Sequence, residues 1–124
     1  MSSVLIVDDS PTIRSIIRAY LEITTSFRVC GEAGNGTTAI ERAQALKPDV
    51  VLLDLVMPQV NGAQAAPIIK RLLPDTKIIL FSFLTDVPSN SLAEAVGVDA
   101  VLSKPTDLTG IVEAIRKVTS RIVS

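Results

Sequence analysis

The chain has 124 residues, 48% of them apolar and 20% charged, and these values predict one globular domain with a substantial hydrophobic core. The formal net charge of −1 gives no reason to expect nucleic-acid binding, which usually requires a basic face. No apolar run approaches the roughly 20 residues that span a bilayer, and no basic segment precedes the first apolar run as in a signal peptide, so we expect a cytoplasmic protein.

Five short apolar runs predict strands, and helix-like segments separate them. The strands are expected at residues 4–7, 28–32, 50–53, 77–81 and 100–102. Cys30 lies in the second run and is the only cysteine, so it cannot form an internal disulfide. We interpret it as a small core residue in a reducing compartment. The alternation of strands and helices predicts a parallel sheet covered on both faces.

The first and last helices have the clearest apolar spacing. In the first, the apolar residues at helical spacing are Ile13, Ile16, Ile17, Tyr20 and Leu21. Ser10 followed by Pro11 is typical of a helix start. In the last, the corresponding residues are Leu108, Ile111, Val112, Ile115 and Val118.

Three further helices are expected between them. Gly34-Asn35-Gly36 predicts a turn before a helix that carries Ile40, Ala43 and Leu46. No Lys-Ser/Thr follows this turn, so a phosphate-binding loop is not indicated. The next helix, about residues 63–73, contains Pro67, which predicts a bend or a late start because an interior proline costs about 3 kcal/mol. A fourth helix is expected at residues 88–96.

Charged residues follow three of the apolar strands. Asp54 ends the run Val50–Leu53, Asp8-Asp9 ends the first strand, and Ser103-Lys104-Pro105 follows the last. The core gains nothing from an ionised aspartate, whereas ligands bind at the carboxyl ends of parallel strands. Three clustered acids repel one another without a cation, and oxygen ligands favour Mg²⁺ over zinc or copper. The absence of histidine excludes Ser-His-Asp and Cys-His catalysis and histidine metal sites within this chain.

These residues, taken in order, resemble those of a known family. Asp8-Asp9, Asp54, Pro58 and Gly62, Ser82, and Lys104-Pro105 resemble the motif residues of a response-regulator receiver domain of the CheY-like, two-component type. The resemblance covers essentially the whole chain. It implies one receiver domain over residues 1–124, with a flavodoxin-like, doubly wound α/β fold. The implied sheet has five parallel strands in the order 2-1-3-4-5, with five helices.

The resemblance also implies a role for each matched residue. Asp54 would be the phosphoacceptor, a carboxylate nucleophile that forms an acyl phosphate. Asp9, Asp54 and the backbone carbonyl of Val56 would bind Mg²⁺ directly, and Asp8 would act through water. Lys104 would contact a phosphoryl oxygen from a cis Lys104-Pro105 peptide, and Ser82 would report the phosphoryl group.

The implied partners are a histidine kinase or phosphotransfer protein and a downstream protein or effector domain. The downstream contact would use the fourth helix, fifth strand and fifth helix, with a homodimer on phosphorylation as a further expectation. The domain would bind neither nucleic acid nor membrane. It would be a signalling module rather than an enzyme, catalysing only its own phosphorylation and dephosphorylation.

The chain departs from the family at four positions near the site. Phe83 replaces the usual small residue after Ser82, and Val101 replaces the usual aromatic residue three positions before Lys104. Val56 and Leu84 stand where polar residues are often found. The usual hydroxyl-to-aromatic relay is therefore in question.

Alternative interpretations remain open from the residues alone. Asp8 by itself fits a helix-capping acid, and Lys104 by itself fits a surface charge. Two other functions share this fold class: a Mg²⁺-dependent phosphatase or phosphotransferase that uses Asp54, and a flavodoxin-like nucleotide binder. Such phosphatases usually need a cap that covers the substrate, and the chain offers no segment for one. Asp8-Asp9 would repel the phosphate of a bound nucleotide.

Overall fold

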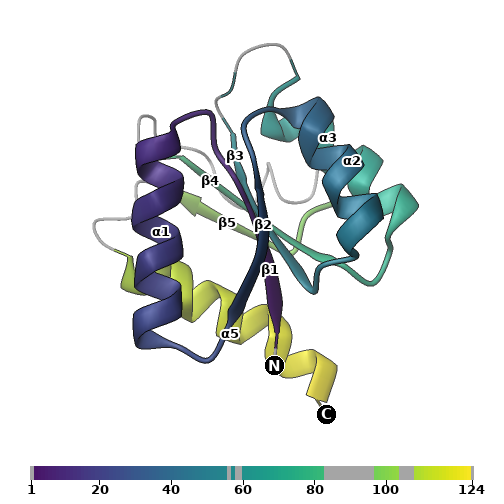
Figure 1. The fold of residues 1–124 in the computed structure, drawn as a ribbon. Helices are drawn as coiled ribbons and strands as arrows, with labels where there is room; N and C mark the ends of the chain where they lie inside the picture. The colour runs from purple at the N-terminus through teal and green to yellow at the C-terminus, as the bar shows by residue number, and fades with distance from the viewer. Residues whose placement is uncertain (1, 56, 58–59, 83–96, 104–107, 124) are drawn as a thin grey trace.

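A computed structural model describes residues 2–55, 57, 60–82, 97–103 and 108–123 of the chain. The elements in chain order are β1 (Ser3–Val7), α1 (Pro11–Thr24), β2 (Arg28–Ala33), α2 (Gly36–Leu46), β3 (Val50–Asp54), α3 (Gly62–Leu72), β4 (Lys77–Ser82), β5 (Ala100–Ser103) and α5 (Thr109–Val123) (Figure 1). All five strands are parallel and lie in the order β2-β1-β3-β4-β5, which confirms the predicted sheet. The helix expected at residues 88–96 lies outside the described residues.

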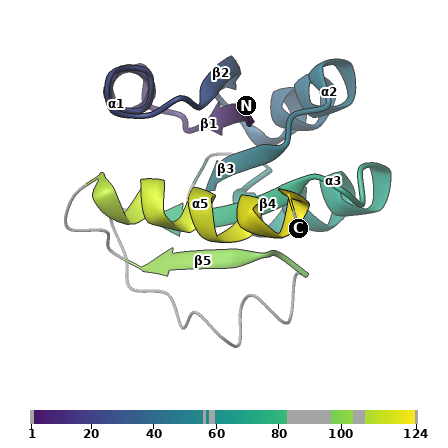
Figure 2. The same ribbon diagram turned by 90° about the horizontal axis from the view of Figure 1, so that it is seen from below.

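Helices cover both faces of the sheet. Helices α1 and α5 lie on one face, and α2 and α3 lie on the other (Figures 1 and 2). Successive residues of β1 point to opposite faces: Val4 and Ile6 join the core under α1 and α5, whereas Leu5 and Val7 join the core under α2 and α3. All four are fully buried. Burial on both faces explains why the central strands are apolar at every position.

Helix α1 begins as predicted, but its buried face is narrower than expected. The Oγ of Ser10 accepts a hydrogen bond from the backbone N–H of Ile13 at 3.2 Å, and Pro11 is the first helical residue. Ile17 and Leu21 are buried. Ile16, however, is 50% exposed and does not belong to the buried face, because it lies at the margin of the apolar stripe that meets the sheet.

Helix α3 starts one residue earlier than predicted despite its interior proline. The side chain of Asn61 accepts from the N–H of Gln64, and the side chain of Gln64 accepts from the N–H of Asn61, both at 3.0 Å. This reciprocal cap fixes the start at Gly62. Pro67 lies inside the helix on its exposed side. The late start is therefore wrong, and the bend at Pro67 stays a prediction.

Cys30 is less buried than expected. It lies on β2, an edge strand, and is only partly covered. Its Sγ donates to the carbonyl of Val4 at 3.5 Å, and burial raises the pKa of the thiol. The neutral thiol fits a packing role. Among the helices of the described part of the chain, none is both long and apolar enough to cross a membrane.

Candidate functional site

Three acidic side chains come together at the carboxyl edge of the sheet. Asp8, Asp9 and Asp54 each offer a carboxylate oxygen, and these oxygens all lie within 4.8 Å of one another. The strand register explains the meeting, because Val7 of β1 pairs with Leu53 of β3 and each is followed in the sequence by an aspartate. The predicted juxtaposition of these three residues is confirmed.

The three carboxylates differ in their surroundings. Asp8 is 3% exposed and Asp54 is 8% exposed, whereas Asp9 is open to solvent. Asp8 Oδ1 accepts a hydrogen bond from the N–H of Ser10 at 2.8 Å. Burial raises the pKa of Asp8; the Ser10 hydrogen bond opposes this shift, and the negative charge of Asp9 adds to it. Two buried acids beside a third create a strongly anionic site that a divalent cation would neutralise.

The donor set fits Mg²⁺. Every ligand atom that the cluster offers is a carboxylate oxygen, and such oxygens suit Mg²⁺ rather than zinc or copper. The exposed Asp9 leaves the cluster open to solvent. A site that is open on one side suits Mg²⁺ because this ion usually keeps several of its waters.

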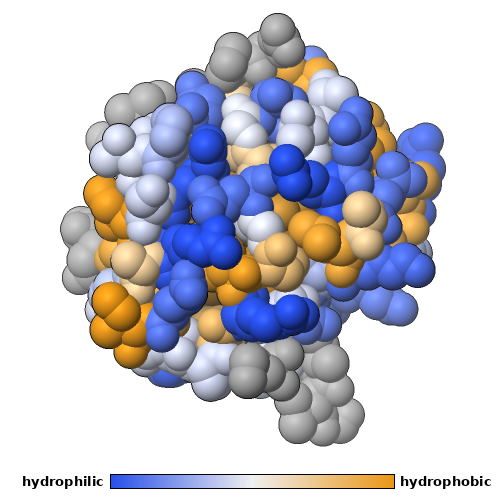
Figure 3. Space-filling model, viewed as in Figure 1, coloured by the Kyte–Doolittle hydropathy of each residue, from blue (hydrophilic) through white to orange (hydrophobic). Residues whose placement is uncertain are grey.

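Arg14 and Glu32 support the backbone of this site, and the sequence did not reveal them. Arg14 Nη1 donates to the backbone carbonyl of Asp8 at 2.6 Å, and its Nε donates to Glu32 Oε1 at 3.0 Å. Arg18 also pairs with Glu32. The backbone N–H of Asp8 donates to the carbonyl of Ala33 at 3.1 Å. On the face shown in Figure 3, a strip of hydrophilic residues runs along the boundary between α1 and β2, the elements that these ion pairs join.

Backbone contacts fix Leu55, directly after Asp54, and Gly62, at the start of α3. The N–H of Leu55 donates to the carbonyl of Phe81 at 2.8 Å, and the N–H of Gly62 donates to the carbonyl of Leu55 at 3.3 Å. A Cβ at position 62 would lie 2.4 Å from the backbone oxygen of Asp54. Gly62 is the first residue of α3, and a glycine is needed there for this close approach.

The other predicted residues are placed only in part. Ser82 ends β4 and pairs with Ser103 of β5, so the residue before Lys104 reaches the same edge as Asp54. Phe81 is fully buried, and Val101 is half-buried on β5. The predictions for the following residues lie outside the described part of the chain: Val56, Pro58, Phe83, Leu84, Lys104 and Pro105.

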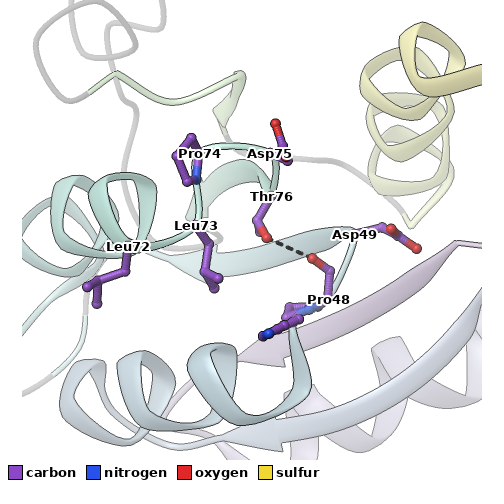
Figure 4. A pocket seen from close by; sticks show the side chains of 8 residues that line it. Pro48, Asp49, Leu72, Leu73, Pro74, Asp75 and Thr76 are labelled. Carbon is purple, nitrogen blue, oxygen red and sulfur yellow. Dashed lines mark hydrogen bonds between the residues drawn. The ribbon is translucent and has the colours of Figure 1, made fainter.

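A pocket lies at the opposite end of the sheet, where the strands begin. It is lined by Lys47, Pro48, Asp49, Leu72, Leu73, Pro74, Asp75 and Thr76 (Figure 4). Thr76 Oγ1 donates to the carbonyl of Pro48 at 2.8 Å, as Figure 4 shows. Asp49 Oδ2 accepts from the N–H of Ser3 at 2.8 Å. These polar groups bond to the backbone at the starts of the strands and so have a structural role. The functional site is therefore the acidic cluster at the carboxyl edge.

Comparison with known proteins agrees with this geometry. The sequence model of the response regulator receiver domain matches residues 4–116. The chain is 39% identical over 117 residues to response regulator protein VraR of Staphylococcus saprophyticus, covering 92% of this chain and 54% of that protein. It is 40% identical over 119 residues to VraR of Staphylococcus aureus, covering 95% of this chain and 56% of that protein. The chain thus spans about half the length of these relatives.

Solved structures show the same fold. The response regulator domain of Thermotoga maritima CheB superposes with a TM-score of 0.86 at 29% identity, over 97% of each chain. The REC domain of AraT, a response regulator from Geobacillus stearothermophilus, gives a TM-score of 0.81 at 31% identity, over 98% of this chain and 95% of that one. With the family match over most of its length, the chain belongs to the response regulator receiver domain family.

Proposed function

We propose that this receiver domain accepts a phosphoryl group on Asp54 from a histidine kinase or phosphotransfer protein, with Mg²⁺ as the required ion. One observation carries the proposal: Asp8, Asp9 and Asp54 place carboxylate oxygens within 4.8 Å of one another at the carboxyl edge of the sheet. Such a cluster weakens the fold without a cation, so a purely structural role does not account for it.

Asp54 is the proposed nucleophile. One of its carboxylate oxygens forms a bond to phosphorus as the bond between phosphorus and the donor's nitrogen or oxygen breaks, and the leaving group keeps the electron pair. Bound Mg²⁺ would lower the repulsion between the carboxylate and the incoming phosphoryl oxygens. Asp9, Asp54 and the Val56 carbonyl are the proposed direct ligands, with Asp8 acting through water. Support for Asp54 comes from its place at the end of β3, beside the acidic pair that follows β1.

Two more residues complete the proposed site. Lys104 is proposed to neutralise a phosphoryl oxygen, and the Ser82 hydroxyl to hydrogen-bond another. The strand pairing of Ser82 with Ser103 supports this, because Lys104 follows Ser103 directly in the sequence. Both groups would favour the phosphorylated state over the free one.

The proposed output is a change in a protein-binding face. Phosphorylation would shift the balance between two conformations and alter the surface formed by the fourth helix, β5 and α5, which would bind a downstream protein, an effector domain or a second copy. The domain would act in the cytoplasm as a signalling module that catalyses only its own phosphorylation and dephosphorylation.

Phosphorylation by a small donor tests the proposal. Acetyl phosphate with Mg²⁺ should add one phosphoryl group to the wild type, measured by intact-protein mass spectrometry. Asp54→Asn should remove the modification, and EDTA should prevent it. Asp75→Asn changes an exposed acid at the opposite edge of the sheet and serves as the matched control. Labelling that persists in Asp54→Asn would refute the assignment, and turnover of a generic phosphate ester would favour a phosphatase.

A further inference from the structure

The turn between β2 and α2 contacts both segments that carry the acidic residues. At one side of the turn, the carbonyl of Ala33 accepts from the N–H of Asp8 at 3.1 Å. At the other, the N–H of Gly36 donates to the carbonyl of Val60 at 3.1 Å. Val60 belongs to the segment that joins Asp54 to α3. A turn distant in sequence from Asp54 therefore bridges the two segments whose carboxylates form the cluster.

The contact at Gly36 leaves no space for a side chain. A Cβ at position 36 would lie 2.3 Å from the backbone oxygen of Val60, and 2.6 Å and 2.9 Å from its Cγ1 and Cβ. Real Cβ atoms essentially never come that close to a backbone oxygen, so the Val60 segment or the start of α2 would have to move. Gly36 does not have a positive φ, in contrast to Gly97. Close approach, and not backbone conformation, is what requires glycine here.

Hydrogen bonds fix the start of α2, so it cannot easily move. The side chain of Asn35 accepts from the N–H of Thr38 at 2.8 Å, and the carbonyl of Asn35 accepts from the N–H of Ala39 at 3.0 Å. Ala39 is fully buried against the sheet. Because the first turn of α2 is held in this way, a side chain at position 36 would displace Val60.

We infer that Gly36 is a positioning residue for the Mg²⁺ site: its close contact with Val60 fixes Val60 and the adjoining start of α3, where Gly62 packs against the backbone of Asp54. The inference rests on the proposed function, because it concerns the same site. Gly62 contacts the backbone of both Asp54 and Leu55, so a displacement of Val60 would be passed on to the residue that carries the acceptor carboxylate. Groups that orient metal ligands without touching the metal commonly affect its affinity.

The test compares alanine at two glycines that lie in the first turns of helices, Gly36 of α2 and Gly110 of α5. Gly36→Ala should weaken Mg²⁺ binding by about tenfold or more, the usual scale for loss of a positioning group. Gly110→Ala is the matched control, since a Cβ there would meet nothing within 4 Å, and its Mg²⁺ affinity should equal that of the wild type. The affinity is measured by NMR titration with MgCl₂. The rate of phosphorylation by acetyl phosphate is measured in parallel and should recover in Gly36→Ala at saturating Mg²⁺.

A folded Gly36→Ala variant, verified by circular dichroism, with wild-type Mg²⁺ affinity would overturn the inference. If Gly36→Ala does not fold, NMR titration of the wild type with MgCl₂ provides the test. The amide resonance of Gly36 should then shift more than that of Gly34. An unchanged Gly36 resonance would overturn the inference. The proposed function fails separately, because a wild type that Mg²⁺ and acetyl phosphate do not modify refutes it whatever the glycine variants do.

Discussion

Arg14 holds the backbone of Asp8: its Nη1 atom lies 2.6 Å from the Asp8 carbonyl oxygen. The same guanidinium donates from Nε to Glu32 on β2. Glu32 thus orients the group that holds the chain where β1 ends and the acidic pair begins. Neither Arg14 nor Glu32 belongs to the acidic cluster, yet both bear on its geometry.

Glu32 should make stability depend on pH. Burial alone raises the pKa of Glu32, but the hydrogen bonds from Arg18 and Arg14 outweigh it and hold the pKa below its ordinary value of 4.5. A carboxyl with a depressed folded-state pKa stabilises the fold above its unfolded-state pKa, and this stabilisation disappears as the pH falls through the folded-state pKa. Glu32→Gln should therefore lower the free energy of unfolding by about 1 kcal/mol at neutral pH.

Urea unfolding over a pH series checks this, and the curves of wild type and Glu32→Gln should converge as the pH falls below 4.5. Glu22→Gln is the matched control, because Glu22 pairs with Arg18 on the exposed side of α1. A difference between wild type and Glu32→Gln that stays constant down to low pH would contradict the ionic explanation.

Asp8 should destabilise the metal-free fold when it is ionised. Its folded-state pKa is raised, chiefly by burial, so stability is lost as the pH rises through that pKa. Asp8→Asn keeps an oxygen for the Ser10 N–H and removes the charge. In EDTA at neutral pH we expect its Tm to rise by about 4 °C, or about 1 kcal/mol.

Mg²⁺ should raise the Tm of the wild type more than that of Asp8→Asn, as differential scanning fluorimetry can measure. Asp75→Asn, at an exposed position remote from the cluster, should behave as the wild type does. A lower Tm for Asp8→Asn in EDTA would show that the ionised carboxylate is a net stabiliser.

Thr76 should contribute to stability without affecting the functional site. Its side chain is buried, and Oγ1 donates to the Pro48 carbonyl (Figure 4). Thr76→Val keeps the shape and removes the donor, so the free energy of unfolding should fall by about 1 kcal/mol. Thr24→Val removes an exposed hydrogen bond from the Thr24 hydroxyl to the carbonyl of Tyr20, and it should lower the free energy of unfolding by less. An altered rate of phosphorylation in Thr76→Val would contradict this prediction, because it would show that the Thr76 hydrogen bond affects the functional site.

Phe83 should restrict access to the phosphoryl site. It follows Ser82, where the family usually has a small residue. Phe83→Ala should raise the rate of phosphorylation by acetyl phosphate, the rate of acyl phosphate hydrolysis, or both. Unchanged rates with a stability loss of about 3 to 5 kcal/mol would instead make Phe83 a packing residue.

Val101 should limit how far phosphorylation changes β5. Its side chain is half-buried and has no aromatic ring to move inward. Amide chemical shifts with and without beryllofluoride should therefore change more after Ser82 than at Val101. The largest changes centred on Val101, with little effect after Ser82, would contradict this.

Much of the fold and the centre of the site could be read from the chain. An aspartate that ends an apolar run, as Asp54 does, costs free energy to bury and adds nothing to the apolar core, so it indicates a site. Strict alternation of strands and helices restricts the sheet to parallel arrangements. Ser10 and Pro11 start α1 through contacts within one turn. Each of these depends on residues close together in sequence.

The tertiary structure decided the contacts between segments that are far apart in sequence. Only the packed backbones bring Gly36 against Val60 and make glycine necessary there. Only the pairing of β2 beside β1 brings Glu32 to Arg14. The adjacent residues Asp8 and Asp9 look equivalent in the sequence, yet one is buried and the other exposed. Sequence patterns encode local periodicity and the cost of burying charge, whereas close approach and ion pairing depend on how distant segments are placed by the packed core.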